Sequence, residues 1–162
     1  DLGSVDVGSL LAETLGTLQP SVATPPPGGQ RLTFPAATPT PRVVTHKGDS
    51  GQAAALLAWP TGGGIGGIRT GRQIDVLAAI FNDRLFERLR AQDGASYGPI
   101  VTSDWPTGFD DGGYLLVGSL LAPKDIDRFF DIAGDIAREL ATKPVSDDEL
   151  GRAAGPIREQ IS

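Results

Sequence analysis

The 162-residue sequence contains no cysteine, no methionine and a single histidine, His46. Without cysteine, no disulfide framework can form, and a zinc site built from cysteine and histidine cannot be assembled within this chain. His46 lies in the polar segment Thr45-His-Lys-Gly-Asp49, with no second histidine or nearby glutamate at helical spacing. We therefore expect a surface-loop histidine and no metal bound by this chain alone.

Basic residues are also in the minority, and long apolar runs are missing. Lys and Arg number 14 against 20 Asp and Glu, giving a net charge of -6, and no basic cluster stands out. This balance argues against a nucleic-acid or anionic-membrane surface. No run of about 18 apolar residues exists, which argues against a membrane span. Hydrophobic residues at 40% and charged residues at 21% are typical of a folded globular protein.

Proline and glycine are abundant, and they divide the chain. The first segment ends in a short amphipathic helix over residues 9–18, with leucines at helical spacing. Prolines and glycines then crowd residues 21–41, which predicts an extended linker rather than a proline-motif docking site. Because the chain begins with Asp1 and both of its ends fall inside expected structural elements, we expect a fragment of a longer protein.

Two strands and a long helix are predicted after the linker. The strands cover residues 42–45 and 52–59, and the second is so apolar that we expect burial on both of its faces. Thr70 and Gln73 are spaced as a capping box for the helix that follows. The apolar stripe of this helix comprises Ile74, Leu77, Ala78, Phe81, Leu85 and Leu89.

The remaining segments predict an antiparallel strand pair followed by two helices. Residues 100–105 and 114–121 flank a turn-rich loop and form the pair. Ser146 and Glu149 are spaced as a capping box for the last helix, which Pro156 should kink or shorten. Strands and helices that do not strictly alternate predict an α+β fold, with helices mainly on one face of the sheet.

A glycine-rich loop at residues 61–67 formally matches the spaced glycines of a dinucleotide-binding turn. Pro60 interrupts the tight strand-to-helix turn, and no acidic residue ends a second parallel strand about 20 residues on. We therefore expect a mobile hairpin or lid. Nucleotide binding remains an alternative.

The end of the long helix carries the strongest functional signal. Arg90 falls in its last turn, Gly94 suits the left-handed position just past a helix end, and Tyr97 opens the next extended segment. This order can bring a guanidinium and a phenol to one spot. The alternative is a cation placed favourably at a helix C-terminus beside an ordinary strand aromatic.

The segments Arg84-Leu-Phe-Glu-Arg-Leu-Arg90 and Gly94-Ala-Ser-Tyr97 together resemble the second-half domains of the pitrilysin/insulinase family of zinc metallopeptidases. Further landmarks in the family's order are residues 3–7 with the helix after them, residues 50–54 before an apolar strand, and residues 145–150 at the start of a late helix. The resemblance thus covers most of the chain.

The resemblance implies an α+β two-layer sandwich of the mitochondrial-processing-peptidase-like metallohydrolase type, with a mixed or antiparallel sheet. Residues 1–20 would end a preceding homologous domain, residues 21–41 would be the linker, and residues 42–162 would form a C-terminal-type domain truncated at its C-terminus. In the family, zinc is held by an inverted His-x-x-Glu-His motif in the first half of the protein. This chain lacks that motif, so the zinc of the full assembly would lie elsewhere.

By position in the family motif, Arg90 and Tyr97 would bind the substrate backbone and stabilise the transition state, and no catalytic residue would lie in this chain alone. The implied partners are an N-terminal catalytic domain or a zinc-bearing partner subunit, together with a peptide substrate. We expect a noncatalytic, substrate-binding domain of a zinc metalloendopeptidase that is inactive by itself. The alternative is a structural or assembly subunit of the same fold.

Overall fold

The chain divides into two units, Asp1–Arg31 and Leu32–Ser162, in the computed structural model, which describes residues 6–18, 34–38, 40–93 and 98–161. The first unit contains the predicted amphipathic helix, α1 (Val7–Glu13), followed by a 3-10 turn. Asp6 caps this helix, because its carboxylate accepts hydrogen bonds from the backbone N–H groups of Gly8 and Ser9. The domain boundaries expected from the resemblance stay predictions.

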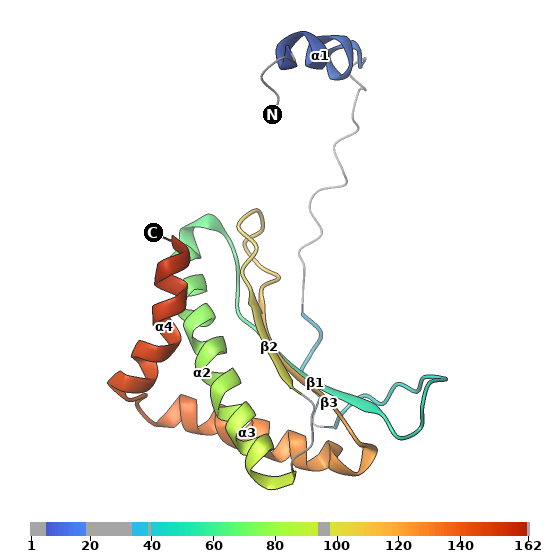
Figure 1. The fold of residues 1–162 in the computed structure, drawn as a ribbon, viewed down its shortest axis with the longest axis vertical. Coiled ribbons are helices and arrows are strands. Elements are labelled where there is room, and N and C mark those ends of the chain that lie inside the picture. Colours follow the sequence, from blue (N-terminus) through green and yellow to red (C-terminus); the bar gives the residue numbers. More distant parts are fainter. Residues whose placement is uncertain (1–5, 19–33, 39, 94–97, 162) are drawn as a thin grey trace. The chain divides into compact units, whose positions relative to one another are not determined.

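The second unit is a three-stranded antiparallel sheet with three helices. The strand order is β1-β3-β2, so the last strand in sequence lies between the other two. Figure 1 shows the helices on one side of this sheet, with α4 beside α2. The elements are β1 (Ala53–Pro60), α2 (Ile68–Asp93), β2 (Pro99–Asp104), β3 (Tyr114–Leu121), α3 (Ile126–Thr142) and α4 (Asp147–Ile161). The predicted α+β class and the antiparallel pairing of β2 with β3 are confirmed.

The core lies between the sheet and the helices. Alternate side chains of the strands face α2 and α3, as the two-residue period of a strand requires. The largest fully buried side chains are Phe81, Leu85, Val117, Phe129 and Ile136. The middle of the predicted α2 stripe, Ala78, Phe81 and Leu85, is buried.

Strand β1 is buried on one face only, so the expected burial on both faces is wrong. Ala55 is 3% exposed, whereas its neighbour Leu56 is 59% exposed. Leu56 pairs with Gly118 of the neighbouring strand β3. A Cβ atom added to Gly118 would come within 2.4 Å of a Leu56 methyl carbon, so the Leu56 side chain lies over this glycine. An apolar run does not reveal whether a second layer covers the sheet, and the described helices cover one side.

The segment before β1 also differs from expectation. Residues 42–45 form no strand, and Val43 and Val44 are 84% and 78% exposed. Phe34, in the predicted linker, instead lies against Tyr114 of β3, with ring centroids 6.4 Å apart. Part of the proline-rich segment therefore contacts the sheet.

The ends of α2 and α4 differ in part from the predicted capping boxes. A short 3-10 helix leads into α2, which begins at Ile68, so Thr70 lies inside the helix and does not cap it. At α4, the backbone N–H of Glu149 donates to Ser146 Oγ at 3.3 Å, but the Glu149 carboxylate binds α2 instead of completing a capping box. Helix α4 continues through Pro156 to Ile161, so this proline does not shorten it.

Candidate functional site

Three arginines occupy the second half of α2, at positions 84, 88 and 90. The apolar stripe of the helix, with Phe81 and Leu85, faces the core. The arginines therefore lie on its flanks and at its end. Their partners among the described residues differ: Arg84 and Arg88 pair with carboxylates, and Arg90 lies against an aromatic ring.

Arg84 is held by α4. Its Nε and Nη2 atoms donate to the two carboxylate oxygens of Glu149 at 2.6 and 2.8 Å, and the two side chains are only 19% and 18% exposed. These hydrogen bonds raise the pKa of the Arg84 guanidinium and lower the pKa of the Glu149 carboxyl. A two-fold, charge-assisted contact of this kind fixes both position and orientation.

Arg88 is held by α3. Its Nη2 donates to Glu139 Oε2 at 2.6 Å, and Arg84 Nη1 lies 3.7 Å from the same oxygen. Glu139 therefore stands between the two arginines and links α3 to α2. Together with Glu149, it fixes the C-terminal half of α2 on two neighbouring helices.

Arg90 is exposed at the end of α2. Its guanidinium carbon lies 6.0 Å from the centre of the Phe86 ring, a cation–π distance, and Phe86 is itself 45% exposed. Within the described residues, no carboxylate pairs with Arg90. The guanidinium is thus a charged donor open to a ligand. Gly94 and Tyr97 lie outside the described residues, so the approach of Tyr97 to Arg90 stays a prediction.

The glycine-rich loop packs around Trp105. An added Cβ at Gly67 would come within 2.4 Å of Trp105 Cζ2, and one at Gly71 within 2.7 Å of Trp105 Cγ. The indole Nε1 donates to the Gly64 carbonyl oxygen at 2.9 Å. The glycines therefore allow a tryptophan to approach the backbone closely. The loop, for which a mobile hairpin or lid was expected, is thus a turn packed against Trp105.

Two N–H groups of this loop, those of Gly64 and Gly67, already donate to backbone carbonyls. Gly64 N donates to the Pro106 carbonyl at 2.8 Å, and Gly67 N donates to the Gly64 carbonyl at 3.2 Å. A phosphate-binding loop instead directs free N–H groups at its ligand. The geometry thus gives no support to the dinucleotide alternative.

A comparison with protein families identifies the fold. The family model described as the peptidase M16 inactive domain matches residues 3–155. The chain belongs to the peptidase M16 family. It corresponds to the noncatalytic C-terminal domain, and the predicted membership of the pitrilysin/insulinase family is confirmed. A comparison with curated proteins gives no match.

The M16 domain shows no metal-binding donor set in the part of the chain that the structure describes. No group of three or more histidine, cysteine, aspartate or glutamate side chains is placed to hold a metal ion there. His46 is exposed, and its Nδ1 accepts a hydrogen bond from the Gly48 N–H at 2.9 Å. These residues do not fit a zinc ion. Among the described helices of the M16 domain, none is long and apolar enough to cross a membrane.

Proposed function

We propose that this M16 inactive domain is the substrate-binding half of a zinc metalloendopeptidase. In this proposal it supplies Arg90 and Tyr97 to an active site whose zinc motif lies in an N-terminal half or in a partner subunit. The domain alone hydrolyses no peptide bond.

One observation carries the proposal. Of the three arginines in the second half of α2, Arg84 and Arg88 are tied to carboxylates of neighbouring helices, whereas Arg90 is exposed without such a partner among the described residues. The two ion pairs fix the helix that presents Arg90. A charged donor on a fixed helix end is suited to binding a ligand in a defined orientation.

The chemistry of these side chains suits a peptide backbone. A guanidinium is permanently charged and donates hydrogen bonds in a planar fork, so it can bind a carbonyl oxygen of the substrate. The interaction strengthens as negative charge develops on that oxygen during attack on the peptide bond. The Tyr97 hydroxyl would be a second donor to the same region. Phe86, beneath Arg90, offers apolar contact to a substrate side chain.

The proposal is tested by recombining this chain with the zinc-bearing half of the enzyme. We expect no peptidase activity from the chain alone and activity from the mixture. In the mixture, Arg90→Ala combined with Tyr97→Phe should lower kcat/KM by on the order of 100-fold, the usual effect of losing an oxyanion contact. Unchanged kinetics with normal assembly would favour the structural-subunit alternative.

A further inference from the structure

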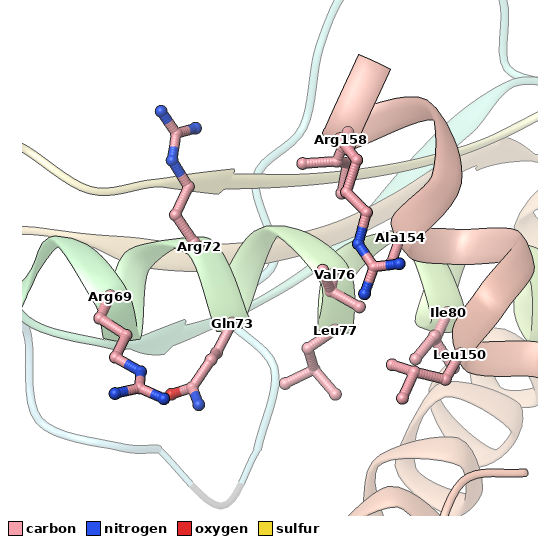
Figure 2. Close-up of a pocket in the computed structure, with 10 residues that line it drawn as sticks. Arg69, Arg72, Gln73, Val76, Leu77, Ile80, Leu150, Ala154 and Arg158 are labelled. Carbon is pink, nitrogen blue, oxygen red and sulfur yellow. The ribbon is translucent and has the colours of Figure 1, made fainter. Parts of the chain in front are cut away.

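A groove lies between the first half of α2 and one face of α4, away from Arg90. Its volume is about 470 Å³, and Figure 2 shows the side chains that line it. The apolar residues are Val76, Leu77, Ile80, Leu150, Ala154 and Ile157, and the polar ones are Arg69, Arg72, Gln73 and Arg158. Leu150 is 43% exposed and Leu77 is half-buried, so this part of the apolar lining is open to solvent, whereas Ile80 and Ala154 are buried beneath it.

The charge of the groove is opposite to that of the chain. Three arginines and no carboxylate line it, although Asp and Glu outnumber Lys and Arg by 20 to 14 in the sequence. In Figure 2, Arg69 lies beside Gln73, and Arg158 extends from α4 toward α2. Arg72 points away from Arg69 and pairs with Asp75 at 3.4 Å. Arg69 has no ion-pair partner among the residues that the structure describes.

The shape of the groove suits a helix. Its lining residues on α2 run from Arg69 to Ile80, about 16 Å along the axis or three helical turns. On α4 the lining positions 150, 154 and 157 recur at helical spacing. Two helices side by side thus form an apolar floor into which the ridge of a third helix can pack.

We propose that this groove docks an amphipathic helix of a partner protein whose apolar stripe is flanked by carboxylates. The apolar stripe would cover Leu77 and Leu150, and the carboxylates would face Arg69. An acidic helix is attracted to this rim, whereas a basic helix of the same apolar pattern is repelled by it.

The inference is independent of the proposed function. Ile80, the near end of the groove, is separated from Arg90 by ten residues of α2, or about 15 Å. Substitutions at the two places should therefore act independently. Loss of groove binding with unchanged peptidase kinetics, or the reverse, separates the two proposals.

The test uses the full chain and two fluorescent synthetic helices of about four turns. Both carry leucines at positions i, i+3, i+4 and i+7; one has glutamates beside the leucines, and the other has lysines at the same positions. We expect fluorescence anisotropy to show binding of the glutamate peptide at least about ten-fold tighter than of the lysine peptide, and weaker in high salt. Arg69→Glu should reduce or reverse this preference.

Leu150→Asp and Arg90→Ala are the matched variants. Leu150 is exposed, so Leu150→Asp should leave the circular dichroism spectrum unchanged and abolish binding of the glutamate peptide. Arg90→Ala should leave that binding unchanged. Equal binding of the two peptides, no binding of either, or full binding by Leu150→Asp would overturn the proposal.

Two other occupants are tested with the same variant. Sedimentation that reveals self-association lost in Leu150→Asp would assign the groove to a second copy of the chain. Binding to anionic vesicles, lost in Leu150→Asp and without peptide binding, would assign it to a lipid surface. Either result would contradict the partner-helix proposal.

Discussion

Arg84 of α2 and Glu149 of α4 are 65 positions apart in the sequence and are joined by two hydrogen bonds, of 2.6 and 2.8 Å. Arg84 opens the segment that carries the family resemblance, and its guanidinium faces the domain's own helix. This arginine is thus a structural residue of the motif, whereas Arg90 at the end of the same segment is exposed. The motif therefore contains one arginine, Arg84, that ties α2 to α4, and another, Arg90, that is exposed at the end of α2.

Removing this support should destabilise the domain. We expect Arg84→Ala to lower the free energy of unfolding by about 1–2 kcal/mol, because it leaves the partly buried Glu149 carboxylate without its two donors. Thermal or urea unfolding measures the change. In a double-mutant cycle with Glu149→Gln, most of the effect should appear as coupling between the two positions.

The exposed pair between Arg138 and Asp135 provides a control for this cycle. Their side chains are 72% and 56% exposed, and solvent screens such a pair. We expect Arg138→Ala to change the melting temperature little. A loss of stability in Arg138→Ala equal to that in Arg84→Ala would mean that the Arg84–Glu149 contact has no special role.

The same contact predicts a pH dependence. Because hydrogen bonds from Arg84 lower the pKa of the folded-state Glu149 carboxyl, the contact stabilises the fold fully above the unfolded-state pKa, about 4.3. This stabilisation is lost as the pH falls from there through the lower folded-state pKa. Glu149→Gln should therefore lose less stability than the native chain on acidification across this range. Parallel curves would contradict the assignment.

The packing of the glycine-rich loop predicts two opposite outcomes at adjacent positions. Gly67→Ala should lower stability by about 1–3 kcal/mol, because its Cβ would overlap the Trp105 ring. Gly66→Ala is the matched control, since nothing lies within 4 Å of its added Cβ, and it should be neutral or slightly stabilising. Trp105→Phe should partly rescue Gly67→Ala. Equal effects at positions 66 and 67 would contradict this packing.

The nucleotide alternative predicts a thermal shift, and the structure predicts none. Because Gly64 N and Gly67 N already donate to backbone carbonyls, they are not free to bind a phosphate. Millimolar NAD or ATP should leave the melting temperature unchanged. A concentration-dependent rise, abolished by Gly64→Ala, would restore the alternative.

Local periodicity was sufficient to predict α2 and the β2–β3 pair. Ala78, Phe81 and Leu85 recur at helical spacing and so lie on one face of α2. An apolar face of this kind packs against the core, and these three residues are buried. The apolar pattern of β1 could not predict that Leu56 is exposed, since it does not show how many layers cover the sheet. Isolated valines at 43 and 44 likewise suggest a strand, but the described sheet provides no partner for them.

The sequence could indicate site residues only where they belong to a short contiguous motif. Arg90 and Tyr97 stand in a short motif, so a resemblance could indicate them. Glu149 was predicted as a capping residue, because nothing near it in sequence points to Arg84. The glycines around Trp105 suggested a hairpin or lid because the residue they accommodate lies some 40 positions away. Contacts of this kind depend on the tertiary fold.

The central claim is that α2 presents Arg90 to a peptide substrate while its neighbouring arginines hold the helix in place. The most direct test compares Arg90→Ala with Arg88→Ala in the complete, zinc-bearing assembly, by measuring kcat/KM on a peptide substrate with each variant fully folded. We predict a loss on the order of 100-fold for Arg90→Ala and a change of less than about three-fold for Arg88→Ala. Equal losses, or no loss for Arg90→Ala, would contradict the claim.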